Sequence, residues 1–169
     1  PFSEKNPQKS RKGRYDFNNP FFRFWFRYVY PFKSDLELGE VDSVWKERIK
    51  PDLNSFCRFP FVDICRQRLE RLKRYSKLPF EADKIGFWWN RTDSIDLVAE
   101  GLNGEVLLCH CDWADVRLGS GCLKSLARKA RWFPDASRVY YGFFSGEGFS
   151  KELKMKAAES SDILLLDYY

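Results

Sequence analysis

Apolar and polar residues follow two periods along this chain, a helical period in the first half and an alternating one in the second. Aromatic rings recur at helical spacing over residues 20–30 and predict a helix. Asn19 precedes this helix as a capping residue, and Pro20 stands at its first position. We expect Pro31 to end this helix. A short helix is predicted over 41–49, and a longer one over 60–75, where an apolar stripe lies beside a basic face.

Alternation takes over near residue 84 and predicts a sheet. Strands over 84–89, 94–100 and 105–112 should form consecutive antiparallel hairpins, because turn signals separate them. A helix, a strand, a helix and a strand follow at 118–132, 138–144, 151–160 and 163–167. Strand, helix, strand implies a parallel crossover, right-handed by default. We therefore predict an α/β fold with a mixed central sheet flanked by helices, preceded by an aromatic helical segment.

The composition fits one compact unit, because 169 residues with 44% hydrophobic side chains can bury a core of ordinary size. We expect residues 1–55 to form a basic linker and the aromatic helical segment, and residues 56–169 to form the α/β core. The longest apolar run, 163–166, is far too short to span a membrane, and no secretory signal opens the chain. We expect a cytoplasmic protein without a membrane partner. Because the sequence begins at Pro1, a fragment of a longer chain is the simplest account.

Five cysteines follow no disulfide-scaffold spacing, so buried free thiols are expected. The run Cys109-His110-Cys111 suggests zinc at first sight. However, successive strand side chains point to opposite faces, and the chain has no second Cys/His pair that would complete four ligands. A zinc site is therefore not predicted.

The residues of greatest chemical interest lie on two predicted strands. A five-residue hairpin loop, 101–105, would place Asp96 across from His110 on one face of the sheet, whereas a four-residue loop would separate them. We expect the five-residue loop, and Asp112 then shares the face of His110 by alternation. The alternatives are structural: a hydrogen-bonded histidine, and a carboxylate that pairs with a neighbouring arginine.

This hairpin resembles the active-site hairpin of PD-(D/E)XK nucleases, in which an Asp on one strand and a Glu-x-Lys on the next gather around a divalent cation. Asp96 matches the Asp, while His110 and Asp112 stand at the Glu and Lys positions. The resemblance implies Asp96, His110 and Asp112 as candidate catalytic residues, Asp96 and Asp112 as candidate metal ligands, and Mg²⁺ or Mn²⁺ as the cofactor. Asp112 adds negative charge where a phosphate would approach, and imidazole suits Mn²⁺ better than Mg²⁺. A degenerate site on a nuclease-like core is therefore expected, with a working metal-dependent nuclease as the alternative.

Several longer stretches resemble the C-terminal domain of prokaryotic AAA+-type P-loop ATPases that are abundant in archaea. The stretches are 4–15, 21–31, 61–66, 85–89 and 95–99. The resemblance implies an ATPase domain in the parent chain and a restriction-endonuclease-like core. Because this chain has no Gly-x-x-x-x-Gly-Lys-Ser/Thr motif, we do not expect it to hydrolyse ATP by itself. It also departs from the family at Val62, where the family tends to have Glu.

The net charge is +5, and the basic residues lie in clusters along the chain. Such clusters can bind along the phosphates of DNA. The candidate DNA-binding residues are Arg66, Arg71, Lys73, Arg74, Lys124 and Arg128. A solvated helix face is the alternative for each cluster. The rings over 20–30 favour packing over base stacking, because rings at helical spacing usually fill a core or an interface. A third interpretation follows, a protein-interaction module that packs this helix on the ATPase or on another copy in a homo-oligomer.

Overall fold

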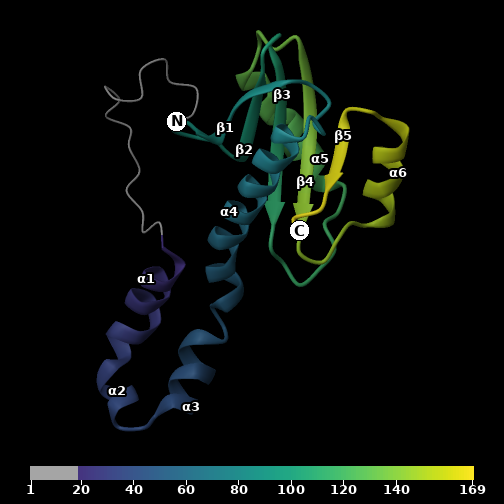
Figure 1. Ribbon diagram of the computed structural model, residues 1–169. Helices are drawn as coiled ribbons and strands as arrows, with labels where there is room; N and C mark the ends of the chain where they lie inside the picture. The colour runs from purple at the N-terminus through teal and green to yellow at the C-terminus, as the bar shows by residue number, and fades with distance from the viewer. Residues whose placement is uncertain (1–18) are drawn as a thin grey trace. The chain divides into compact units, whose positions relative to one another are not determined.

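The computed structural model describes residues 19–169, which divide into two compact units, 19–60 and 61–169 (Figure 1). The predicted basic linker and the motif at 4–15 lie outside the described residues. None of the helices within 19–169 combines the length and the apolar character that crossing a membrane requires.

The first unit consists of short helical segments that follow one another. In chain order they are α1 (Pro20–Phe24), the π-helical turn η2 (Trp25–Val29), the 3₁₀ turn η3 (Tyr30–Phe32), α2 (Lys33–Glu37), α3 (Val41–Val44), the π-helical turn η4 (Trp45–Ile49) and the start of α4 (Leu53–Arg74). The Asn19 side chain accepts the Phe21 N–H at 2.9 Å, the capping role that the sequence predicted. The predicted helix over 41–49 is confirmed as α3 with η4.

Pro31 does not end the first helix, contrary to the prediction. In the π-helical turn the Tyr30 N–H reaches back to the Trp25 carbonyl. Pro31 then falls in the first turn of η3, where a missing N–H removes no necessary bond. The helical path therefore continues to Glu37, and Gly39 turns the chain at φ +88°.

The second unit is built on a five-stranded sheet with the order β1-β2-β3-β4-β5. The strands are β1 (Ala82–Trp89), β2 (Ser94–Gly101), β3 (Glu105–Asp112), β4 (Arg138–Ser145) and β5 (Ile163–Leu166). The first three strands pair antiparallel, and β3, β4 and β5 run parallel. The predicted mixed sheet, with helices on its faces and an aromatic helical segment before it, is confirmed.

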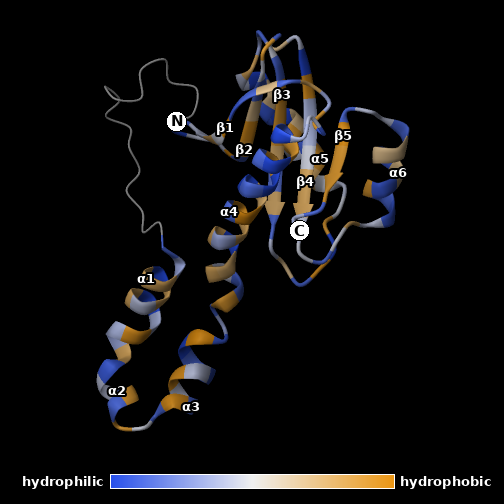
Figure 2. Cartoon of the chain, in the orientation of Figure 1, coloured by the Kyte–Doolittle hydropathy of each residue, from blue (hydrophilic) through white to orange (hydrophobic). Residues whose placement is uncertain are grey.

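Helices cover both faces of this sheet. Residues of α4 from Phe61 onward pack on one face against Leu97, Leu107 and Phe144. The other face carries α5 (Gly121–Lys129) and α6 (Lys151–Glu159). Figure 1 shows the part of α4 from Phe61 onward in front of the sheet and α5 behind it. Figure 2 shows β3 and β5 as mostly hydrophobic, and the middle of β3 is buried, as expected for a strand covered on both faces.

Two helix boundaries differ from the prediction. The helix expected to start at Pro60 starts at Leu53, and Pro60 stands inside it at the cost of one intrahelical hydrogen bond. The helix expected from Leu118 starts at Gly121 and ends in the 3₁₀ turn η5 (Ala130–Trp132), because Leu118 is extended and forms a β-bridge with Phe149.

Candidate functional site

The carboxylate of Asp96 and the imidazole of His110 meet where β2 and β3 lie side by side. The ladder between these strands pairs Leu97 with Cys109, which is the register of a five-residue loop, so Asp96 stands opposite His110 as predicted. His110 Nδ1 lies 3.0 Å from Asp96 Oδ2. A carboxylate accepts hydrogen bonds and does not donate them, so this contact requires the imidazole proton on Nδ1. The pair is partly accessible, with exposed side-chain fractions of 31% for His110 and 20% for Asp96.

The same carboxylate oxygen also accepts a backbone hydrogen bond at the end of the β2–β3 ladder. The N–H of Cys111 donates to Asp96 Oδ2 at 3.0 Å, and Cys111 is fully buried. The regular pairing of β2 with β3 stops at Leu97, so the Asp96 side chain supplies the acceptor that the Cys111 N–H needs beyond that point. Asp96 therefore has a structural task in addition to any chemistry.

Asp112, the third candidate residue of the hairpin, lies at the end of β3. Alternation directs it to the face of His110, where its charge acts on the Cys122 thiol. Burial raises the pKa of Cys122 to about 11, and the Asp112 carboxylate adds to that rise. Within residues 19–169, no three His, Cys, Asp or Glu side chains come together in a way that could hold a metal ion.

Three cysteines lie on the opposite face of the sheet from His110. Cys109 and Cys111 join Cys65 of α4 in the core, and all three are fully buried free thiols, as expected for the buried positions. Burial raises the pKa of Cys109 and of Cys111 well above the ordinary value. The Cys109 and Cys111 thiols therefore stay protonated, and all three cysteines serve as small apolar core residues.

The candidate DNA-binding residues divide between the two faces of the sheet. Those of α4 lie on the face away from His110: Arg71 and Arg74 are exposed, Arg66 pairs with Asp63 at 3.6 Å, and the Lys73 ammonium donates to the Asp83 carbonyl. Those of α5, Lys124 and Arg128, are exposed on the face that His110 shares. The six residues thus form two surfaces rather than one.

Sequence reasoning missed a cluster that holds the end of α5 against the start of β2. Trp132 Nε1 and the Arg131 guanidinium donate to Asp93 Oδ2 at 3.0 and 3.1 Å, and Lys129 donates to the Ser94 carbonyl at 2.7 Å. The Trp132 N–H, and after it Arg131, hold the pKa of Asp93 below its usual range. Asp93 reads as an ordinary turn residue, and nothing in the local pattern links it to a side chain 39 residues later. The cluster places the basic end of α5 beside the strand that carries Asp96.

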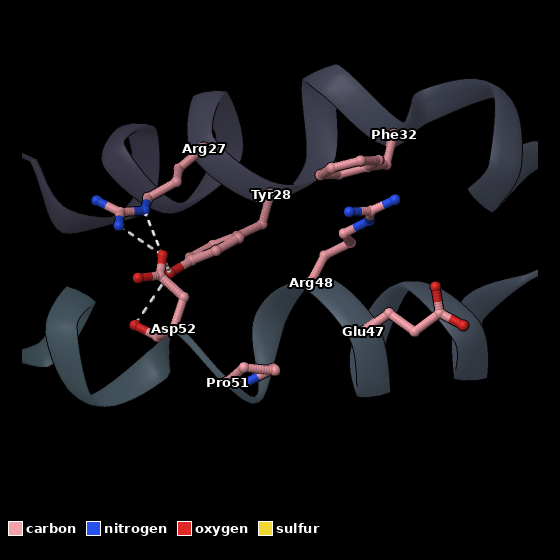
Figure 3. A pocket seen from close by; sticks show the side chains of 7 residues that line it. All are labelled: Arg27, Tyr28, Phe32, Glu47, Arg48, Pro51 and Asp52. Atoms are coloured by element: carbon pink, nitrogen blue, oxygen red, sulfur yellow. Dashed lines mark hydrogen bonds and ion pairs between the residues drawn. The ribbon is translucent and has the colours of Figure 1, made fainter.

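An open pocket of about 450 Å³ lies in the first unit (Figure 3). Its lining residues are Arg27, Tyr28, Phe32, Glu47, Arg48, Pro51 and Asp52. The Tyr28 hydroxyl donates to Asp52 Oδ2 at 2.6 Å, and Arg27 Nε donates to the same oxygen at 2.7 Å. Burial, and after it the bond to Asp52, raise the pKa of Tyr28 to about 12. These polar groups bind one another across the pocket, so we interpret them as a structural link between η2 and the start of α4.

The chain is similar to a curated protein and to a solved structure. The chain is 34% identical over 163 residues to the uncharacterized protein MJECL04 of Methanocaldococcus jannaschii; the match covers 94% of this chain and 35% of that protein. The chain thus spans about a third of the length of this curated relative. The crystal structure of the protein of unknown function AF1548 aligns with 62% of this chain and 58% of its own, at 19% identity and a TM-score of 0.41.

A family model also matches most of the chain. It covers residues 25–125, which include η2, α4, the first three strands and both members of the Asp96–His110 pair. The model is that of DUF234, described as archaea bacterial proteins of unknown function. The chain belongs to the DUF234 family.

Proposed function

We propose that this chain is a nuclease-like module with a degenerate metal site, and that it binds DNA as part of a larger protein that contains a P-loop ATPase. The observation that carries the proposal is the position of the Asp96–His110 pair on the same face of the sheet as the exposed cations of α5. A hairpin in which an acid faces its partner across two antiparallel strands, next to a basic helix, suits a phosphodiester substrate.

The contacts of Asp96 support a degenerate site. Metal-assisted hydrolysis needs carboxylate oxygens directed at a cation, together with a group that activates or orients water. Here Asp96 Oδ2 already accepts from His110 and from the buried Cys111 N–H. The position where PD-(D/E)XK nucleases have Lys holds Asp112, which repels a phosphate unless a cation lies between them. We infer that the scaffold of the site remains while its hydrolytic chemistry is lost.

The charge of α5 supports DNA as the ligand. Lys124 and Arg128 lie four residues apart on the exposed side of the helix, so they project from neighbouring turns in the same direction. The contacts of Lys129 and Arg131 with Ser94 and Asp93 fix the end of the same helix. A rigid helix with aligned cations can follow a phosphate backbone without reading base sequence. We propose α5, rather than α4, as the principal DNA contact.

The ATPase as a partner rests on the resemblance of the motifs at 21–31, 61–66, 85–89 and 95–99. The relative from Methanocaldococcus jannaschii is nearly three times as long as the matched part, which leaves room in that protein for further domains. We propose that this chain acts as the DNA-contacting module of such a protein.

Fluorescence anisotropy with a labelled DNA duplex tests the proposal. The double variant Lys124→Glu/Arg128→Glu should weaken binding and lower the slope of log K against log salt concentration by about two, because two phosphate contacts are lost. Arg71→Glu/Arg74→Glu is the matched control, since it makes the same charge change on the other face of the sheet. Equal losses for the two variants would refute α5 as the contact, and absence of binding by the unaltered chain would refute DNA as the ligand.

A further inference from the structure

The first unit presents a row of exposed aromatic rings that neither the candidate site nor the DNA surface uses. Its members, which we call the aromatic stripe, are Phe21, Phe22, Trp25, Phe26 and Tyr30. Between 38% and 63% of each of these residues is exposed. Contiguous exposed rings of this kind mark interaction surfaces on proteins.

The other side of the same helix is already packed. Phe24, Tyr28 and Phe32 join the buried residues Val44 and Ile49 in the core of the first unit. The helical path through α1 and η2 is therefore apolar on both sides, and a helix of that character needs a partner on each. Within residues 19–60, the core covers one of these two sides.

The charged residues near the aromatic stripe are directed elsewhere. The Arg23 guanidinium lies 4.5 Å from the ring centre of Phe59, and Arg27 binds Asp52. A surface rich in rings and poor in charge has the composition of a protein interface core. DNA requires cations, and a helix that lies on a membrane needs a basic polar face where this helix has a packed core. Protein is therefore the partner that the chemistry fits.

The geometry of the rings suits a second copy of the same helix. Phe21 and Trp25 stack with ring centres 6.1 Å apart, and Phe26 and Tyr30 contact at 5.9 Å. Each pair is four residues apart and forms a ridge along the helix. The rings therefore form a continuous apolar surface along the helical path, and a two-fold axis would make each half of a contact between two such surfaces equivalent.

The exposed area reaches what a dimer needs. An aromatic side chain buries about 150–250 Å² when it is fully covered, so five rings that are about half exposed offer roughly 500 Å² per copy. Two copies would bury roughly 1,000 Å², the lower limit of specific interfaces. We propose that the aromatic stripe is a symmetric contact between two copies of this chain, with the weak affinity of a small interface.

Sedimentation equilibrium across protein concentrations up to about 200 µM tests this inference. The unaltered chain should form dimers, and Phe22→Glu/Tyr30→Glu should weaken the dimer by about 30-fold or more, because charged side chains would replace central rings. Both residues are exposed, so these changes should leave the fold intact, which circular dichroism would verify. Leu38→Glu is the matched control: Leu38 is 80% exposed, apolar and outside the stripe, and its variant should dimerise normally.

Three results would overturn the inference. They are a monomer at every concentration, a dimer that the stripe variant leaves unchanged, and a monomer that binds lipid vesicles through the stripe. The test is independent of the proposed function, because the stripe variant changes no residue of α5 or of the Asp96–His110 pair.

Discussion

Replacing Asp96 with alanine should destabilise the chain considerably, even though the residue stands at the centre of the candidate site. The change removes the acceptor of the buried Cys111 N–H and the partner of His110 Nδ1. A buried donor left unsatisfied costs about 1–3 kcal/mol, and a hydrogen bond to a charged group contributes about 1.5–3 kcal/mol. Because these two terms overlap and Asp96 is partly exposed, we expect a loss of about 2–3 kcal/mol in the free energy of unfolding.

Urea unfolding followed by tryptophan fluorescence measures this loss as a midpoint lowered by about 1 M or more. Asp96→Asn keeps an oxygen acceptor for Cys111 and should lose only about 1 kcal/mol. Asp162→Ala is the control, because the exposed Arg138–Asp162 pair should contribute less than about 1 kcal/mol. An Asp96→Ala chain as stable as the unaltered one, or more stable, would refute the structural role, because that is the behaviour of a carboxylate held in place for catalysis.

Two further predictions concern the cores. Burial raises the pKa of Tyr28 from 10 to about 12, so the folded state holds the phenol in its neutral form more strongly than the unfolded chain does. This preference contributes fully to the free energy of unfolding below pH 10, and the contribution is lost as the pH rises toward 12. Tyr28→Phe should remove that part of the alkaline loss of stability, and an unchanged pH profile would contradict the raised pKa. Gly142→Ala should lower the free energy of unfolding by about 1–3 kcal/mol, because the added methyl group would lie 2.6 Å from Cys109 Sγ. Gly119→Ala is the control: its added methyl group meets no atom within 4 Å, so the urea midpoint should hardly change.

The sheet could be predicted from the sequence, because alternation and turn residues are local signals that identify its strands. The register of the central hairpin depends on the length of its loop, for which we expected five residues rather than four. Once that loop is fixed, Asp96 must face His110, and the structure agrees. The burial of Trp88, with Trp89 only half buried, follows from the same alternation.

The errors arose where distant or cooperative contacts override local preference. The local sequence predicts a helix end at Pro31, because it gives no sign of the preceding π-helical turn. It also predicts helix at Leu118, because the β-bridge with Phe149 joins residues that are distant in the sequence. Contacts such as Asp93 with Trp132 join segments that share no local pattern. The two basic clusters look alike in sequence, and only the packing of α4 and α5 separates them onto opposite faces.

The most direct test of a degenerate site on a DNA-binding scaffold is incubation with supercoiled plasmid and Mg²⁺ or Mn²⁺, followed by native gel electrophoresis. The unaltered chain should be compared with Asp96→Asn and Asp96→Ala. We predict retarded plasmid that remains uncut, with the same result for Asp96→Asn. Nicking by the unaltered chain that disappears in both variants would contradict a degenerate site, and plasmid that is neither retarded nor cut would contradict DNA binding.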